Sequence, residues 1–171
     1  MSITELAPAK LNLTLDVGAR RPDGYHEITS VMQSAALYDV VTLETVETDD
    51  IVLECPGTDL PTGPDNLAWK AADVFFRETN IPRTGIIIRL EKKIPSQAGL
   101  GGGSSDAAAV LRGMRRLFGA NLSDEALETM AARVGSDVPY CVRGGTALAR
   151  GRGERLTALS PLPMCWFVIV K

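Results

Sequence analysis

PSQAGLGGGSSDAA, residues 95–108, links a predicted strand to a predicted helix, and the fold is organised around it. Four of the five residues 99–103 are glycine, so backbone N–H groups can turn toward one anion without side chains in the way. Ser104 and Ser105 open the helix, whose first N–H groups have no partner within it. A glycine loop at a helix start predicts a phosphate site, with the serine hydroxyls as further donors or as a contact to Mg²⁺.

Other interpretations of this loop fit less well. A flexible linker or a simple helix cap is disfavoured because the loop follows GIIIRL, residues 85–90, whose β-branched run is typical of a buried strand. A Walker A loop ends in G-K-[S/T], which this stretch lacks. A dinucleotide fingerprint requires a parallel β-α-β unit around the glycines, and the sequence does not show that alternation.

The strands outside this region are predicted from apolar spacing. Strict alternation in KLNLTLDV, residues 10–17, predicts a half-buried strand with Leu11, Leu13, Leu15 and Val17 on one face. Further strands are expected at 39–47, paired with 50–55, and at 85–90, 143–150 and 165–170.

Helices are expected at 66–79, 104–118 and 123–135, where apolar residues recur with helical spacing. Asp65 or Asn66 is suited to cap the first of them, and Ser123 the third. Strands and helices are mixed without strict β-α-β alternation. The sequence therefore favours an α+β fold with one sheet covered by helices on a face.

Composition narrows the functional class. The net charge of −3 argues against nonspecific nucleic-acid binding, which needs basic surface. The longest apolar run, Trp166–Val170, is far shorter than the roughly 20 residues of a membrane span, and no signal-peptide pattern opens the chain. The three cysteines form no C-x-x-C pair, which favours reduced thiols over disulfides or zinc. We expect a cytoplasmic protein without a membrane partner.

The carboxyl end of the sequence predicts a domain boundary. An apolar strand runs directly into Lys171 with no polar tail, which would leave apolar surface uncovered. We expect residues 1–160 to form one domain and residues 161–171 to begin a second that is cut short.

Three blocks of sequence resemble the GHMP kinases, a family named for galactokinase and the homoserine, mevalonate and phosphomevalonate kinases. PSQAGLGGGSSDAA is similar to their second motif. APAKLNLTLDVGARRPDGYHEITSVMQSAALYD at 7–39 and GSDVPYCVRGGTALARGRGE at 135–154 resemble the branch that phosphorylates a cytidine diphosphate-linked methylerythritol. The resemblance implies the α+β N-terminal domain of these kinases, with a mostly antiparallel sheet, similar to the second domain of a ribosomal small-subunit protein.

The resemblance also implies the catalytic pair. In similar kinases the residues matching Lys10 and Asp137 meet at the acceptor hydroxyl. The carboxylate takes or orients the hydroxyl proton, while the ammonium stabilises that carboxylate and the transferring phosphoryl group. Without the resemblance, these two residues would be read as an ordinary ion pair or as two separate surface charges.

The acceptor site follows from the same resemblance. The residue matching Tyr25 stacks on cytosine, and the one matching His26, the only histidine, bonds the edge of the base. An aromatic face and an imidazole suit a pyrimidine. Asn12 shares the strand face of Lys10 and is expected to contact substrate, and Met32 stands where the family often has an aromatic beside the substrate. The alternatives are solvated or structural roles for these side chains.

For the donor, the resemblance implies ATP with Mg²⁺, although no residue is assigned as a protein ligand of the metal. Asn66 and Lys70 are expected to border the adenine, with a solvated helix face as the alternative. The phosphates are expected in the glycine loop, formed by Pro95, Ser96, Gln97, Ala98, Gly99, Leu100, Gly101, Gly102, Gly103, Ser104 and Ser105.

Three functions remain open at the level of sequence. The first is phosphorylation of the cytidine diphosphate-linked alcohol, and the second is phosphorylation of another small alcohol. The third is a non-catalytic nucleotide-binding module, because the family's third glycine motif and the aromatic opposite Tyr25 are absent from this sequence. We expect a small-molecule partner, weak or no activity of this chain alone, no nucleic-acid partner, and a monomer or homodimer.

Overall fold

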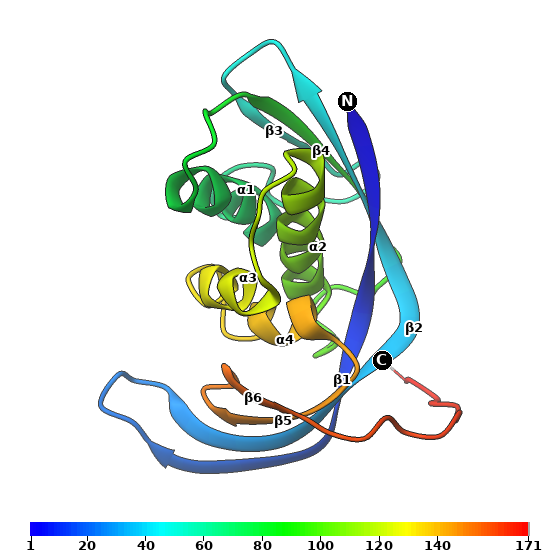
Figure 1. Ribbon diagram of the computed structural model, residues 1–171. Coiled ribbons are helices and arrows are strands. Elements are labelled where there is room, and N and C mark those ends of the chain that lie inside the picture. The colour runs from blue at the N-terminus through cyan, green and yellow to red at the C-terminus, as the bar shows by residue number, and fades with distance from the viewer. Residues whose placement is uncertain (171) are drawn as a thin grey trace.

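Two long strands form the frame of the molecule in the computed structural model, which describes residues 1–170. β1 (Ser2–Arg20) and β2 (His26–Val46) pair antiparallel along most of their length (Figure 1). The second half of β2 also pairs antiparallel with β4 (Gly85–Glu91), and its first half with β5 (Thr146–Gly151). Because β2 takes a different partner at each end, one strand connects two regions of the sheet.

Two short strands complete the six-stranded sheet. β6 (Arg155–Ala158) pairs antiparallel with β5, and β3 (Ile51–Glu54) pairs parallel with β4. The order along the main path is β3-β4-β2-β5-β6, and β1 lies off this path against β2. The sheet of residues 1–170 is therefore mostly antiparallel, as the resemblance to the GHMP kinases implied.

Within the described residues, four helices cover one side of the sheet (Figure 1). They are α1 (Leu67–Glu78), α2 (Gly102–Leu117), α3 (Asp124–Ala131) and α4 (Val138–Arg143). The side chain of Asn66 accepts from the N–H of Ala68 at the start of α1, and Ser123 accepts from Ala126 at the start of α3. Both predicted caps are confirmed.

The core lies between these helices and the sheet. Phe75 of α1 and Leu111 of α2 are fully buried against Leu43 of β2 and Ile88 of β4. Fully burying one such side chain contributes about 1.5–3 kcal/mol. α2 is buried along most of its length, so the end that carries the glycine loop is held firmly against the sheet.

The predicted α+β class is confirmed, but several strand predictions are wrong in detail. The segments 39–47 and 50–55 are both extended, yet they do not pair with each other, because β4 lies between them. On β1, Leu13, Leu15 and Val17 are exposed rather than buried. The end of the β1–β2 hairpin extends beyond the part of the sheet that the helices cover (Figure 1).

The carboxyl-terminal segment also differs from expectation. Residues 165–170 form no strand, and Trp166 and Val168 are exposed. α4 and β6 were not predicted, and α2 begins at Gly102, two residues before its expected start. Of the expected second-domain segment 161–171, Lys171 lies outside the described residues.

Candidate active site

A cavity of about 370 Å³ opens beside the glycine loop. It is lined by Pro95–Ser104 together with Leu60, Pro61, Asp65, Asn66, Leu67, Lys92, Ile94 and Asp106. The start of α1, the β4–α2 loop and the start of α2 thus surround one space. The volume suits a small ligand, since such sites typically measure about 300–1,000 Å³.

The loop backbone takes conformations that favour glycine. Gly99 and Gly101 have φ values of 72° and 66°, in the left-handed region. A Cβ at position 101 would also lie 2.6 Å from the Cγ of Lys10, which is closer than van der Waals contact permits. Gly101 therefore allows the loop to rest directly on the Lys10 side chain.

The start of α2 supplies polar groups to this cavity. Gly101 is the N-cap and provides no side-chain cap, so the first N–H groups of the helix remain available to a ligand. The Ser105 hydroxyl is buried and has no hydrogen-bond partner within residues 1–170. Ser105 does not line the cavity, unlike Ser104 and the other predicted loop residues, so the structure places its hydroxyl behind the cavity wall.

Lys10 and Asp137 meet beside the loop. The Lys10 Nζ lies 2.9 Å from the Asp137 Oδ2, and the two side chains are 7% and 31% exposed. The same Nζ donates to the Asn12 Oδ1 at 3.3 Å, and the Lys10 backbone N–H donates to the Leu100 carbonyl at 2.9 Å. Residues from β1, the glycine loop and the start of α4 therefore converge on one point.

The position of Asp137 is set by α4, which it immediately precedes. Arg112 of α2 donates to the carbonyls of Cys141 and Leu6, both at 2.8 Å, and so ties α4 to β1. The buried Tyr140 hydroxyl donates to the Gly145 carbonyl at 2.7 Å, and burial raises its pKa to about 12. The Asp137 carboxylate thus stands at the start of a helix anchored at several points.

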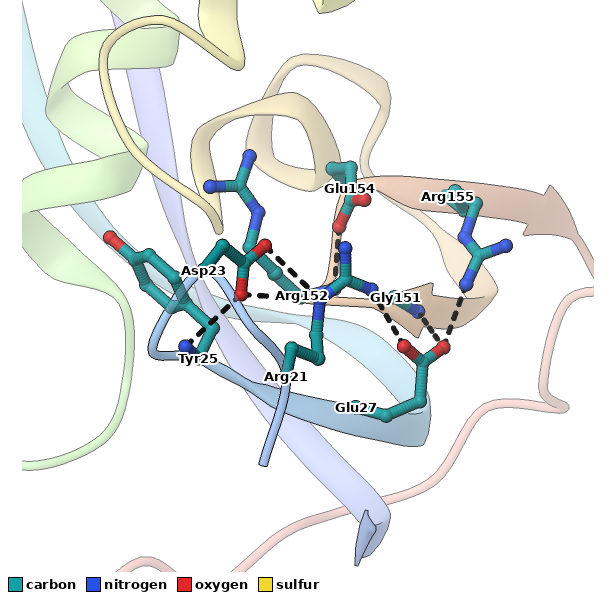
Figure 2. A network of polar contacts seen from close by, with 8 residues as sticks. All are labelled: Arg21, Asp23, Tyr25, Glu27, Gly151, Arg152, Glu154 and Arg155. Carbon is teal, nitrogen blue, oxygen red and sulfur yellow. Dashed lines mark hydrogen bonds and ion pairs between the residues drawn. The ribbon is translucent and has the colours of Figure 1, made fainter. Parts of the chain in front are cut away.

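The predicted acceptor residues lie at the turn between β1 and β2. Tyr25 is 50% exposed, and the His26 Nδ1 lies 3.1 Å from the Gly18 carbonyl oxygen. The Arg152 guanidinium, from the β5–β6 turn, lies 4.9 Å from the centre of the Tyr25 ring (Figure 2). Arg152 was not predicted, because the turn that brings it to Tyr25 is distant in sequence.

Two predicted site residues are placed differently. Met32 pairs with Asn12 across the sheet, but its side chain is 1% exposed and belongs to the core, so it supports the strand instead of facing a ligand. The Lys70 Nζ donates to the Val134 carbonyl at 3.1 Å, and the residue does not line the cavity. Of the two expected adenine neighbours, Asn66 lines the cavity.

A buried ionic network under the loop was missed altogether. Lys92 contacts the carboxylates of both Asp39 and Asp106, and all three side chains are at least nine-tenths buried. Asp39 also accepts from the backbone N–H groups of Lys93 and Ile94. The network joins β2, the β4–α2 loop and α2, and its members are too far apart in sequence for spacing to reveal them.

Two carboxylates share one ammonium in this network. Burial raises the pKa of Asp106 to about 7, with Lys92 opposing the rise and Asp39 adding to it. Burial also works to lower the pKa of Lys92, but the two carboxylates outweigh it and raise that pKa. We infer that Lys92 stays charged while Asp106 takes up a proton near neutral pH.

Asp106→Asn is therefore expected to change how stability depends on pH. An acid whose folded pKa is raised binds more protons in the native state, so its stabilisation is present below pH 3.8 and is lost as pH rises to about 7. Asparagine does not titrate. The unaltered chain should therefore lose up to about 4 kcal/mol of unfolding free energy through this group as pH rises from 4 to 8, and the variant should not. The unfolding free energy of the variant minus that of the unaltered chain should rise by the same amount. Urea denaturation across that range measures the difference, and a constant difference would contradict the assignment.

Within 1–170, no three His, Cys, Asp or Glu side chains are grouped so as to hold a metal ion. Among the helices of residues 1–170, none has the length and apolar character that a membrane span requires. Cys55, Cys141 and Cys165 are free thiols.

Comparison with known proteins shows which proteins this chain resembles. Residues 66–145 match the family model described as GHMP kinases N terminal domain. The whole chain is 48% identical to 60% of a 4-diphosphocytidyl-2-C-methyl-D-erythritol kinase of Enterococcus faecalis. In a protein of the same name from Heliobacterium modesticaldum, identity is 52% over 97% of this chain and 53% of that protein. The chain thus spans little more than half the length of these relatives.

A solved structure agrees with these relatives. The crystal structure of a 4-(cytidine 5'-diphospho)-2C-methyl-D-erythritol kinase matches 94% of this chain and 56% of its own, with a TM-score of 0.78 and 42% identity. This chain is thus similar in sequence to GHMP kinases over residues 66–145, and it shares the fold of the matched part of this kinase structure.

Proposed function

We propose that this chain takes part in the ATP-dependent phosphorylation of 4-diphosphocytidyl-2-C-methyl-D-erythritol at its 2-hydroxyl, a step of non-mevalonate isoprenoid synthesis. The observation that carries the proposal is the contact of the glycine loop with Lys10, whose Nζ is 2.9 Å from Asp137. The donor site at the loop and the acceptor site at Asp137 would then meet at Lys10. We take the proposed substrate from the names of the similar kinases.

The proposed chemistry needs little more than positioning and charge. Asp137 would accept or orient the proton of the attacking hydroxyl, and Lys10 would stabilise both that carboxylate and the transferring phosphoryl group. Phosphoryl transfer depends largely on alignment and electrostatic stabilisation, with the metaphosphate-like group passing between two oxygens in line. Asn12, which accepts from the Lys10 Nζ, would hold the ammonium in place.

The donor nucleotide would lie in the cavity beside the loop. Asn66 lines the cavity and would border the adenine, and the lining residues 95–104 would surround the phosphates. Mg²⁺ usually keeps several waters and binds through substrate phosphates with few protein ligands. Mg²⁺ held mainly by the triphosphate would need no cluster of acidic side chains, and residues 1–170 contain none that could hold a metal ion. The ion would neutralise charge on the transferring phosphate.

The acceptor would lie across the β1–β2 turn. The exposed Tyr25 ring offers a surface on which cytosine can stack, with His26 beside it for the edge of the base.

We also propose that residues 1–160 form the ATP-binding domain and that 161–171 begin a second one, which accords with the exposed Trp166 and Val168. Free thiols are in keeping with the cytoplasm, where the protein would act as a monomer or homodimer.

A substrate panel tests the proposal. The protein is incubated with MgATP and, separately, with the cytidine diphosphate-linked alcohol, mevalonate, homoserine and galactose, and phosphate transfer is followed by ³¹P NMR under single-turnover conditions. The proposal predicts a phosphomonoester signal only with the first alcohol. Transfer to another alcohol would contradict the substrate, and binding of ATP without any transfer would support a nucleotide-binding module instead.

A further inference from the structure

The β1–β2 turn and the β5–β6 turn lie against each other at the acceptor end of the molecule (Figure 2). The first carries Tyr25, and the second carries Arg152, whose guanidinium stacks on the Tyr25 ring. A Cβ at Gly153 would lie 3.6 Å from the Asp137 Oδ1, so the second turn also reaches the catalytic carboxylate. The relative position of the two turns therefore sets the space between Tyr25 and Asp137.

One carboxylate joins the two turns. The Glu27 Oε1 accepts from the Gly151 backbone N–H at 3.1 Å and from Arg155 at 2.7 Å, both on the β5–β6 side. Its Oε2 accepts from Arg21 at 2.7 Å, on the β1–β2 side. Figure 2 shows Glu27 between these three donors. We refer to Glu27, Arg21, Arg155 and the Gly151 N–H as the Glu27 clasp.

The clasp extends to the Tyr25 backbone. Arg21 contacts Asp23 as well as Glu27, and the Asp23 Oδ1 accepts from the Tyr25 N–H at 3.1 Å. Tyr25 is thus connected to the clasp through its own turn, and it meets Arg152 of the opposite turn through its ring. A shift of either turn would separate the ring from the guanidinium.

We propose that Glu27 is a positioning residue for the acceptor, holding the two turns so that Tyr25 and Arg152 face the same bound cytidine diphosphate group. This inference rests on the proposed function. Glu27 makes no contact with Lys10 or Asp137, and it would act only through the turns that it joins.

Because Glu27 is exposed, its replacement can test a positioning role without unfolding the protein. Its side chain is 42% exposed, and exposed ion pairs add little to stability. The Arg21 guanidinium lowers the pKa of Glu27, so the carboxylate is ionised at neutral pH. Loss of Glu27 should therefore leave the fold intact while releasing the turns.

The first measurement is fluorine NMR of the chain labelled with 3-fluorotyrosine. The chain has three tyrosines, which are Tyr25, Tyr38 and Tyr140. Tyr25→Phe assigns the signal of residue 25. In Glu27→Ala this signal should shift toward that of free fluorotyrosine while the other two stay in place. The matched control is Glu54→Ala, because Glu54 is 47% exposed, lies on a strand and pairs with Arg89 at 2.8 Å.

The second measurement is calorimetric titration with cytidine 5′-diphosphate and, separately, with ATP. Glu27→Ala should weaken cytidine diphosphate binding about tenfold, as coupled polar groups commonly do, without changing ATP affinity. Glu27→Gln keeps an acceptor for the Gly151 N–H, so its cytidine diphosphate affinity should lie between those of the unaltered chain and Glu27→Ala. Equal cytidine diphosphate affinity in Glu27→Ala, or an unmoved Tyr25 signal, overturns the inference. No binding by the unaltered chain overturns the proposed function instead, and the acceptor role with it.

Discussion

Asp137→Asn is expected to lower the single-turnover rate of phosphate transfer by about 10²–10⁴, the usual contribution of a positioned general base. The amide keeps the shape of the side chain and an oxygen for the Lys10 Nζ, which lies 2.9 Å from the carboxylate, but it cannot take a proton. ATP binding should be unchanged, because the loop backbone is untouched. Rapid-quench kinetics with ATP and the cytidine diphosphate-linked alcohol measure the rate, and calorimetry measures the binding.

The matched control for this prediction is Asp73→Asn. Asp73 lies on α1, is mostly buried and is paired with Arg77 and Arg83, away from the cavity. The Asp73→Asn variant should keep a transfer rate within about twofold of that of the unaltered chain, because remote sites usually act independently. A rate in Asp137→Asn close to that of this control would exclude the carboxylate from the chemistry and leave the Lys10–Asp137 contact as a structural ion pair.

Asp39→Ala is expected to lower the free energy of unfolding by about 3–5 kcal/mol, the cost of breaking a buried ion pair by removing one partner. The variant leaves the backbone N–H groups of Lys93 and Ile94 without their acceptor. It also leaves the buried Lys92 ammonium with Asp106 as its remaining carboxylate partner. Urea denaturation with a constant m-value measures the loss.

Asp39→Asn provides the graded comparison, since its amide oxygen can still accept from the two N–H groups. We expect its loss to be clearly smaller than that of Asp39→Ala. Glu54→Ala removes an exposed ion pair, so its free energy of unfolding should lie within about 0.5 kcal/mol of that of the unaltered chain. A loss below about 1 kcal/mol in Asp39→Ala would contradict a structural role for the network beneath the loop.

Local signals in the sequence predicted most of the elements around the glycine loop and the helices that pack beside it. The caps at Asn66 and Ser123 and the buried run at 85–90 act through neighbouring residues, so spacing alone revealed them. The glycine loop was recognisable for the same reason. Its close fit on Lys10 was not, because that contact depends on how β1 passes behind the loop.

Tertiary context explains the predictions that failed. Alternation on β1 identified a strand, but it could not show that no helix covers Leu13, Leu15 and Val17. Apolar content suggested a strand at 165–170, although a strand forms only where a neighbour offers a free edge. Asp39, Lys92 and Asp106 come from three separate elements, so their network exists only once the chain has folded.

Amide NMR of the chain titrated with MgATP tests the central claim most directly, namely that the loop and the Lys10–Asp137 pair form one site. The N–H signals of Gly99, Gly101, Gly102 and Gly103 should shift together with that of Lys10, whose N–H donates to the Leu100 carbonyl. Gly119, beyond the far end of α2, should not move, and AMP, which lacks the outer phosphates, should produce much smaller shifts. Loop glycines that stay in place while MgATP binds elsewhere would contradict the account.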